Sequence, residues 1–345
     1  MPPSFALLRA HPARRRSFAP RTFGRGAILC SAAIAVLVTT RAHADPSSTS
    51  PEQGYDLGEV QTPRAVAMAG AQNALGTSTT SLFLNPANLP VARVYHFEGF
   101  AAISPEARRQ SYGGAVADSS TNRIAGGFGG TWSTMDPDGI KRTWTDLHLG
   151  LAYPLGDKFS LGATGRYLRV GQAVSSGPFG ASLASDGTRG DPLFNTFTFD
   201  VGATVIPVQQ LRIGVVGHNL TNPGSGLAPT LLAGGVGFTQ DIFSIEGDAM
   251  VDFTTWQKAR GRYMVGGEIF VANHFPIRLG YRYDDGQRTH ALSAGLGYID
   301  RKFSFELSAR RDVASDRPAT MLVAGLRYFY DAGRISPDEA DPVGY

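Results

Sequence analysis

The chain has 345 residues, of which 42% are hydrophobic and 18% are charged, and it contains 42 glycines. This low charge combined with abundant glycine argues against a helical enzyme. The formal net charge of +3 comes from seven arginines in the first 44 residues, and the remaining chain carries 25 basic and 29 acidic residues, so no nucleic-acid partner is expected.

Residues 1–44 are predicted to be a secretory signal peptide. Their arginine-rich head precedes an apolar run at 27–38 and the small-x-small triplet Ala-His-Ala at 42–44, which is the usual order of head, core and cleavage site. The run is shorter than the roughly 20 apolar residues that a transmembrane helix needs. We therefore expect cleavage before Asp45 and export to the envelope of a Gram-negative-type bacterium.

Residues 45–94 do not alternate between apolar and polar positions and are predicted to form a separate N-terminal segment. Small apolar residues fill 64–75, and the stretch "SLFLNPANLP" follows at 81–90. Pro86 fixes its own φ and pushes Asn85 out of the helical region, and the Asn85 side chain can then hydrogen-bond to the backbone two residues on. The alternative is an ordinary turn before the first strand. The turn comprises Asn85, Pro86, Ala87 and Asn88.

Alternation with period two dominates the rest of the chain and predicts fourteen β-strands. Most of them are 9–12 residues long, which suits a tilted strand that crosses a bilayer. The fold class is therefore all-β, with a barrel over residues 95–330 and a polar tail over 331–345 on the periplasmic side. The predicted strands are 95–103, 110–118, 124–133, 143–154, 159–170, 195–206, 211–219, 230–239, 243–253, 262–271, 277–283, 289–299, 303–310 and 320–330.

The connections between these strands alternate between longer polar loops and short turns. This alternation is typical of an antiparallel up-and-down barrel in an outer membrane, with the short turns in the periplasm. The stretch "DDGQR" at 284–288 is an exception and reads as a tight hairpin, in which Asp-Gly would supply positive φ. A soluble β-sandwich is the alternative, but a face that mixes charges with glycines fits a narrow wet lumen better.

Aromatic residues gather near the predicted strand ends. Amphipathic rings at both membrane interfaces are expected of a barrel in lipid, so outer-membrane lipid is a predicted partner. The residues of these belts are Tyr95, Trp132, Trp144, Tyr153, Tyr167, Tyr263, Tyr283, Tyr298, Tyr328 and Tyr330.

Charged side chains are expected to point into the lumen from two neighbouring parts of the barrel. Glu246, Asp248 and Asp252 share one face of the ninth predicted strand, and Arg278 and Arg282 share the same side two strands along. Charges that face inward in a small barrel must be paired or hydrated. We expect ion pairs between the two sets, and a polar substrate path is the alternative. The sequence shows no metal-binding cluster, and no cofactor is expected.

Residues 64–89 resemble the N-terminal segment of the FadL-type outer-membrane transporter family and its PorV-like relatives. The similarity lies in the pattern R-A-x-A-M-A-G-A-x-x-A-L followed by S-L-F-x-N-P-A-x-L, with Ala69 and Asn88 standing where those proteins usually have glycine. The resemblance implies a fourteen-stranded barrel that is closed by an N-terminal hatch. It also implies passive uptake of a hydrophobic, fatty-acid-like molecule, with sideways exit through an opening at a kinked third strand.

The third predicted strand carries four glycines within ten residues, which often marks a bend or bulge. We therefore take this strand as a candidate lateral gate. The alternative is that glycine is simply abundant in this chain. The gate residues are Gly126, Gly127, Gly129 and Gly130.

Two other functions compete with transport. The shortness of the chain and its polar tail favour a PorV-like platform, a barrel that does not transport but docks a protein of the secretion machinery. A membrane-embedded hydrolase would need a nucleophile, a base and an orienting group in contact. His148 and His218 lie in predicted strands, but Asn219 adjoins His218 and neighbours along a strand face opposite ways. We therefore do not expect an enzyme.

Overall fold

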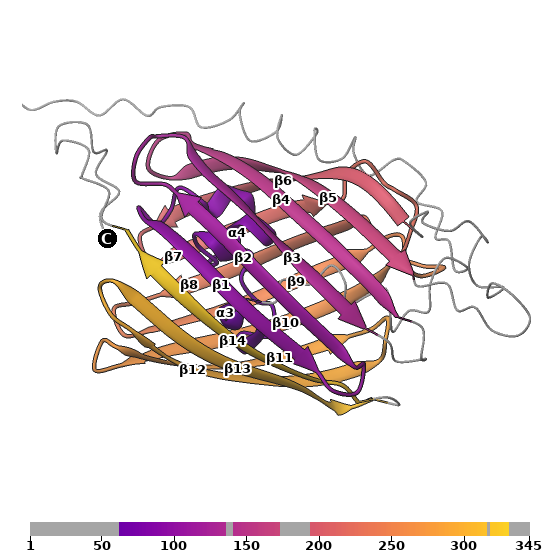
Figure 1. Ribbon diagram of the computed structural model, residues 1–345. Coiled ribbons are helices and arrows are strands. Elements are labelled where there is room, and N and C mark those ends of the chain that lie inside the picture. Colours follow the sequence, from indigo (N-terminus) through magenta and orange to yellow (C-terminus); the bar gives the residue numbers. More distant parts are fainter. Residues whose placement is uncertain (1–61, 136–140, 173–193, 316–317, 331–345) are drawn as a thin grey trace, which may run out of the picture. The chain divides into compact units, whose positions relative to one another are not determined.

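Fourteen antiparallel strands form a closed barrel in the computed structural model, which describes residues 62–135, 141–172, 194–315 and 318–330 (Figure 1). The first and last strands close the ring, in a register that runs from His96↔Phe329 to Ile103↔Leu322. The predicted all-β fold and the strand count are confirmed. The predicted signal peptide and the polar tail lie outside the described residues.

Each strand begins and ends within a few residues of its predicted position, because alternation is a local signal that the barrel preserves. The largest difference is at the end of β13, which reaches Ala314. The strands are β1 (Tyr95–Ser104), β2 (Arg109–Asp118), β3 (Ala125–Met135), β4 (Arg142–Pro154), β5 (Phe159–Gln172), β6 (Phe194–Val208), β7 (Leu211–His218), β8 (Leu231–Thr239), β9 (Phe243–Asp252), β10 (Arg260–Val271), β11 (Phe275–Asp284), β12 (Thr289–Ile299), β13 (Phe303–Ala314) and β14 (Thr320–Phe329).

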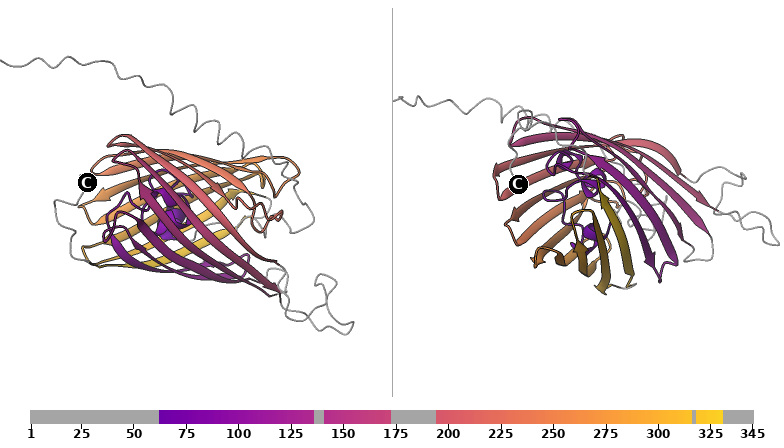
Figure 2. Two further views of the ribbon diagram at one scale, coloured as in Figure 1. Left: turned by 90° about the horizontal axis from the view of Figure 1, so that it is seen from above. Right: turned by 60° about the vertical axis from the view of Figure 1, so that its left-hand side comes forward.

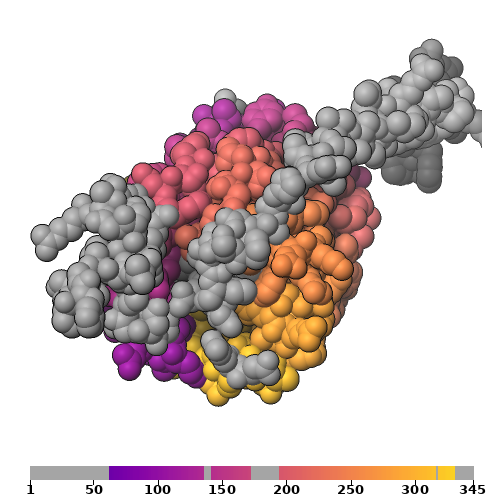
Figure 3. Space-filling model, turned by 90° about the vertical axis from the view of Figure 1, so that its right-hand side faces the viewer, coloured from indigo at the N-terminus to yellow at the C-terminus, as the bar shows by residue number. Residues whose placement is uncertain are grey.

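The two ends of the barrel differ in their connections. We call the end where β1 joins β2 the loop end, and the end where β2 joins β3 the turn end. Sequential strands are neighbours all the way around the barrel, which Figure 2 shows from two further sides and Figure 3 shows from its loop end. At the turn end, β10 and β11 are joined through Ala272 and Asn273, which both have positive φ.

The connection between β11 and β12 is the predicted tight hairpin, but its backbone differs from the prediction. The residue with positive φ is Arg288, not Gly286. Asp284 Oδ1 accepts the Gln287 N–H at 2.9 Å and so closes the turn. A Cβ on Gly286 would collide with the indole of Trp256, so this glycine is needed for close packing and not for a left-handed conformation.

The barrel is apolar outside and polar inside, which is the reverse of a soluble sheet. On β11, for example, Leu279 is 65% exposed whereas Arg278 is 2% exposed. The same alternation recurs on the other strands, so the wall presents a band of exposed apolar side chains. Such a continuous apolar surface is expected where lipid covers the protein.

Most of the predicted aromatic belt lies on this outer surface, with one exception. Trp132, Tyr263 and Tyr328 are exposed on the outside of the wall. The prediction that Trp144 belongs to the aromatic belt is wrong. Its side chain is only 3% exposed and faces the lumen. The even-numbered residues of β4 all point inward, so Trp144 shares a face with His148.

Residues 62–94, which we call the lumenal segment, lie inside the barrel (Figure 1). They contain three short helices, α3 (Pro63–Ala67), α4 (Thr79–Phe83) and η2 (Pro86–Asn88). The helix α3 contacts β11 to β14, α4 contacts β2 to β4, and η2 contacts β4 to β6. No helix among the described residues is both long enough and apolar enough to span a membrane.

Inward-facing glycines let the backbone of the lumenal segment approach the wall closely. A Cβ on Gly162 of β5 would lie 2.5 Å from the backbone nitrogen of Ala87, and one on Gly280 of β11 would lie 2.6 Å from the carbonyl carbon of Met68. Distances this short exclude a side chain. These glycines, which we first interpreted as the lining of a wet lumen, instead mark where the segment lies against the wall.

Candidate functional site

The Asn-Pro-Ala turn forms as the sequence predicts. Asn85 has extended φ and ψ of −126° and 101°, and its Oδ1 accepts the Ala87 N–H at 3.2 Å. Its amide nitrogen donates to the Asn73 carbonyl at 2.8 Å. Asn85 is fully buried, so its hydrogen bonds replace those that it would make to water. The turn therefore ties the two halves of the lumenal segment together.

Asn88 stands where the resembling family usually has glycine, and the structure gives a reason for the difference. Its backbone is not left-handed, since it lies in η2. Its amide nitrogen donates to the Asn73 carbonyl at 2.9 Å, and its amide oxygen accepts the Thr204 hydroxyl of β6 at 2.6 Å. The other departure, Ala69, does adopt positive φ, at 55°, which explains why glycine is usual there.

Two acidic residues of β9 hold the lumenal segment through its backbone. Asp248 Oδ2 accepts the N–H groups of Gln72 and Asn73, both at 2.9 Å. Glu246 accepts the next two, from Ala74 at 2.5 Å and Leu75 at 3.0 Å. Four consecutive backbone N–H groups are thus satisfied by the side chains of two buried acidic residues.

The expected pairing of this acidic set with Arg278 is therefore wrong. Arg278 instead forms ion pairs with Glu268 of β10 and with Glu306 of β13, and in the second pair Nη1 lies 3.0 Å from Oε2. Glu306 can be reached across β12 because Gly295 and Gly297 occupy the inward positions between them. Alternation alone predicted which face these charges occupy but could not predict which partners they meet.

Arginines and glutamates alternate along this side of the lumen in one connected chain. We call this set the ionic sector. It touches the lumenal segment at two points, because Arg64 of α3 lies 3.0 Å from Glu268, and the Thr79 hydroxyl of α4 donates to Glu98. The members, in order of contact, are Arg64, Glu268, Arg278, Glu306, Arg327 and Glu98.

The remaining predicted lumen charges lie closer to the loop end. Asp252 Oδ1 accepts the N–H groups of Thr254 and Thr255 at 2.8 and 2.9 Å, so it orders the start of the β9–β10 connection. Arg282 is buried and faces the lumen from β11. Neither is part of the ionic sector.

The opposite side of the lumenal segment packs against small apolar residues, which we call the apolar sector. Leu82, Phe83 and Leu89 of the segment pack against a group of inward-facing alanines and glycines of the wall. A Cβ on Gly150 would lie 2.7 Å from Leu82 Cδ1, so the wall is nearly smooth here. The wall residues of the apolar sector are Ala115, Ala117, Ala125, Gly127, Gly150 and Ala152.

The four glycines of the candidate gate divide between the two faces of β3. Gly127 and Gly129 face inward, with a Cβ on Gly127 placed 3.5 Å from both Leu82 and Leu89. Gly126 and Gly130 face outward, toward leucine side chains of β4. The strand is paired without a register shift to both β2 and β4, so the wall is closed at β3 in this conformation.

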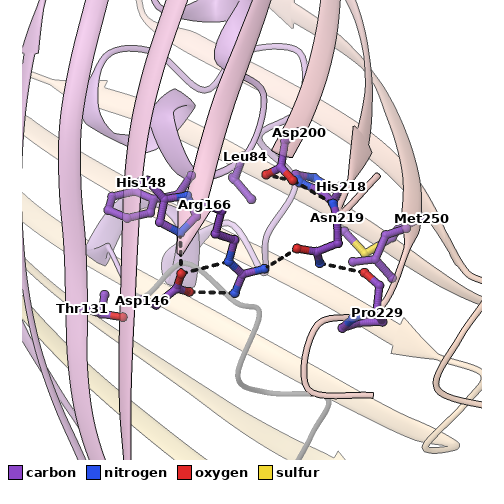
Figure 4. A pocket seen from close by; sticks show the side chains of 12 residues that line it. Leu84, Thr131, Asp146, His148, Arg166, Asp200, His218, Asn219, Pro229 and Met250 are labelled. Carbon is purple, nitrogen blue, oxygen red and sulfur yellow. Dashed lines mark hydrogen bonds and ion pairs between the residues drawn. The ribbon is translucent and has the colours of Figure 1, made fainter. Parts of the chain in front are cut away.

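A small cavity of about 40 Å³ lies between the lumenal segment and the loop end, and Figure 4 shows the side chains that line it. Phe83 and Leu84 border it on the segment side, and Leu231 and Met250 line it from the wall. Its other walls are polar and come from five different strands and one connection. The polar lining residues are Thr131, Asp146, His148, Arg166, Asp200, His218 and Asn219.

Arg166 is bound on several sides within this cavity. Its Nε and Nη2 donate to the two oxygens of Asp146 at 2.9 and 2.7 Å, in a bidentate pair. Its Nη1 donates to Asn219 Oδ1 at 3.1 Å, and Asn219 Nδ2 donates in turn to the Pro229 carbonyl at 2.7 Å (Figure 4). The guanidinium charge is thereby neutralised by a carboxylate of the neighbouring strand.

His218 and Asn219 both line the cavity, although we expected sequence neighbours to face opposite ways. The strand β7 ends at His218, and Asn219 has a positive φ of 54°, so the chain turns before the alternation would send Asn219 outward. Asp200 joins the two residues, since its carboxylate lies 3.0 Å from His218 Nδ1 and accepts the Asn219 N–H at 2.8 Å.

His148 makes one polar contact and one ring contact. Its Nε2 lies 3.0 Å from Asp146 Oδ1, and its ring meets Phe83 edge-on, with centroids 4.9 Å apart. Its Nδ1 is buried and has no hydrogen-bond partner among the described residues. Across all residues that the structure describes, no group of three or more His, Cys, Asp or Glu side chains is arranged to hold a metal ion.

An apolar cluster lies between this cavity and the loop end. Trp144, Leu168 and Val170 face inward from β4 and β5, and Leu227 of the β7–β8 connection packs against them. The sequence predicts a polar external loop for this connection. Its two apolar residues, Leu227 and Ala228, instead pack inward against the wall. The longest predicted loop comprises residues 171–194, of which 173–193 lie outside the described residues.

Sequence reasoning missed most of the cavity residues, although a signal was present. The run Trp144-Thr-Asp146-Leu-His148-Leu-Gly150 places an acid and an imidazole two residues apart on one face of a strand. Only the fold brings Arg166 of β5 to Asp146 of β4, because Arg166 pairs in register with His148, two residues from Asp146 on the same face.

Comparisons with known proteins were made for the sequence and for the fold. No family model matches the sequence, and no curated protein matches it. Solved structures do match the fold. They include the CymD monoaromatic hydrocarbon channel, with a TM-score of 0.60 and 14% identity, over 80% of this chain and 98% of that one.

Two further solved structures have the same fold. The toluene transporter TbuX of Ralstonia pickettii matches with a TM-score of 0.58 and 14% identity, over 80% of this chain and 100% of that one. A FadL homologue of Pseudomonas aeruginosa matches with a TM-score of 0.55 and 14% identity, over 78% and 98% of the two chains. The FadL-type resemblance of residues 64–89 is thereby confirmed at the level of the fold.

Proposed function

We propose that this barrel lies in the outer membrane and takes up hydrophobic small molecules passively, with sideways release into the membrane. The proposal rests on the order in which apolar and polar side chains line the lumen. The apolar cluster at Trp144 comes first from the loop end, the polar cavity follows, and the apolar sector beside β3 comes last. Two of the proteins with matching structures, a monoaromatic hydrocarbon channel and a toluene transporter, support this proposal.

In this proposal the lumenal segment acts as the hatch. It fills the lumen between the cavity and the turn end, so a molecule that passes must move along the boundary between segment and wall. The apolar sector offers such a boundary, because its contacts are between apolar groups that can slide past one another. The hydrogen bonds to Glu246 and Asp248, together with the ionic sector, hold the rest of the segment in place.

Exit through the wall is proposed to occur where β2 pairs with β3. Neighbouring strands are stabilised largely by side chains that face each other across the ladder. Along this seam the facing pairs include Gly114↔Gly130 and Ala115↔Gly129, which have almost no side chain to contribute. Separation of β2 from β3 therefore costs less here than at a seam of bulky residues, and Leu82 and Leu89 lie directly inside it.

The proposal is tested by a bulky residue on the inner face of β3. Gly127→Leu would project between the wall and Leu82, whereas Gly126→Leu would project into lipid from the adjacent position. We expect uptake of propylbenzene into proteoliposomes to fall by at least about tenfold in Gly127→Leu, a loss that corresponds to about 1.4 kcal/mol. Gly126→Leu is the matched control and should transport like the unaltered protein.

Folding of both variants is checked by circular dichroism and by the heat-dependent gel mobility of the barrel. If Gly127→Leu folds and its uptake is unchanged, the route past β3 is wrong. If the unaltered protein accelerates propylbenzene uptake no more than an empty vesicle, the transport function itself is wrong. The platform function remains an alternative prediction, and purification in mild detergent with a stoichiometric protein partner would support it.

A further inference from the structure

We propose that the cavity beside His148 binds the hydroxyl group of a neutral hydrophobic ligand, such as an alkylphenol, and disfavours a carboxylate. This inference rests on the proposed uptake function and names the class of compound that the lumen selects. It assigns a binding role to a histidine that lies in the path between the apolar cluster and the lumenal segment.

The hydrogen-bonding state of His148 is set by its neighbour. Asp146 already accepts two hydrogen bonds from Arg166, and its Oδ1 lies 3.0 Å from His148 Nε2. A carboxylate in this position accepts, so Nε2 carries a proton and donates. In the neutral imidazole Nδ1 is then an acceptor with no hydrogen in place.

This Nδ1 atom needs a partner that the described residues do not supply. His148 is only 5% exposed, and its Nδ1 has no hydrogen-bond partner among the residues that the structure describes. A buried acceptor without a partner is costly. A hydroxyl group fits this position, because it can donate to a neutral Nδ1 and can also accept from a protonated one. A pure hydrocarbon cannot do either.

The surroundings of Nδ1 suit a ligand that is apolar apart from its hydroxyl. The ring of Phe83 packs against His148, and Leu231 and Met250 border the same cavity. The volume of about 40 Å³ exceeds the ~10–15 Å³ that a water molecule requires, but it is well below the ~150 Å³ of a cavity that binds benzene. The cavity therefore takes the hydroxyl end, and the ring must lie against the bordering apolar side chains.

The charges of the cavity disfavour an anion. Its walls hold two carboxylates, Asp146 and Asp200, and a single guanidinium, that of Arg166. The guanidinium is already bound in a bidentate pair with Asp146 and donates to Asn219 as well. A fatty-acid carboxylate would have to displace Asp146 and would leave that buried charge unpaired, which is strongly unfavourable.

The test compares three probes of similar size in lipid nanodiscs that contain the full-length protein. They are 4-propylphenol, propylbenzene and 4-propylbenzoate, and binding is measured by equilibrium dialysis against empty nanodiscs. We expect 4-propylphenol to bind up to about tenfold more tightly than propylbenzene, which is the range of one hydrogen bond. The benzoate should bind more weakly than both.

Variants of His148 isolate the role of Nδ1. His148→Gln retains a donor near Nε2 that can reach Asp146 but has no counterpart of Nδ1, and His148→Phe removes both nitrogens. Both variants should bind 4-propylphenol no better than propylbenzene. His274→Phe is the matched control, because His274 is exposed at the turn end between β10 and β11, and it should retain the preference.

The outcomes separate this inference from the transport function. Equal binding of 4-propylphenol and propylbenzene would mean that Nδ1 is occupied by water only and would overturn the inference while transport stands. Tighter binding of the benzoate, or an unchanged preference in His148→Gln, would overturn it as well. If no probe binds above the empty nanodisc, the inference and the proposed function both fail.

Discussion

The lumenal segment meets two very different walls. On one side the ionic sector contacts it through Arg64 and Thr79, and the carboxylates of Glu246 and Asp248 bind its backbone. On the other side, the apolar sector contacts it through leucines against alanine and glycine. One segment is thus held by directional, charged contacts on one flank and by non-directional contacts on the other.

This difference indicates which contacts resist movement. A buried charge that loses its partner is left in a medium that solvates it poorly. Breaking an ionic contact of the segment therefore costs much free energy. An apolar contact loses energy only in proportion to the area that becomes uncovered. A displacement of the segment would therefore begin at the apolar sector, with the ionic sector as its fixed side.

The largest expected effect comes from the centre of the ionic sector. Arg278→Met removes the cation that lies between Glu268 and Glu306 and leaves two buried carboxylates with fewer partners. We expect the free energy of unfolding to fall by about 3–5 kcal/mol, the usual cost of breaking a buried pair. Urea unfolding in lipid vesicles, followed by tryptophan fluorescence, measures this loss.

A double substitution provides the control for this prediction. Arg278→Met combined with Glu306→Gln removes the stranded charge together with its partner, so it should be less destabilised than the sum of the two single variants. Strict additivity would show that the two side chains do not interact, and the ionic sector would then lose its central contact.

The sequence could predict the strands of both sectors but not the contacts between them. Alternation is a local property, and it placed Arg278 and Glu246 on the correct face because each strand imposes a period of two. Ion pairing depends on which strands are adjacent and on the register between them. The bond between Arg278 and Glu306 passes over Gly295 and Gly297 of β12, a relation between residues that no local pattern contains.

The Asn-Pro-Ala turn could be predicted for the same reason, because its key hydrogen bond from Ala87 to Asn85 spans only two residues. The cavity residue Asn219 could not be predicted, since its direction depends on where β7 ends and on a positive φ. Trp144 shows a third case. A tryptophan near a strand end is typical of a membrane interface. Its even-numbered position on β4, however, directs the side chain into the lumen, and this position in the alternation determines which face it occupies.

A moderate effect is expected at the apolar sector. Leu82→Val removes one methylene from the contact with Gly127 and Gly150, which should lower the free energy of unfolding by about 1 kcal/mol. The looser boundary should increase propylbenzene uptake into proteoliposomes. Leu149→Val is the matched control, since Leu149 projects into lipid from β4, and it should change neither quantity. A loss in Leu82→Val as large as that of Arg278→Met would contradict the distinction between the two sectors.

The smallest effect is expected for an ion pair outside the lumen, which tests whether burial gives the ionic sector its strength. Glu106, in the β1–β2 connection, contacts Arg311 and Thr320 at the loop end, and its side chain is 39% exposed. Exposed pairs contribute little, so Glu106→Gln should change the free energy of unfolding at pH 7 by less than about 0.5 kcal/mol.

The small contribution of Glu106 should also depend on pH in a defined direction. Slight burial raises the pKa of Glu106, but hydrogen bonds from Thr320 and Arg311 outweigh it and hold the pKa below its usual value of 4.5. Because the folded pKa lies below the unfolded one, the contribution is present above pH 4.5 and is lost as the pH falls from there through the folded pKa. Urea unfolding of Glu106→Gln and of the unaltered protein should therefore converge over this range, and a difference that grows on acidification would contradict the assignment.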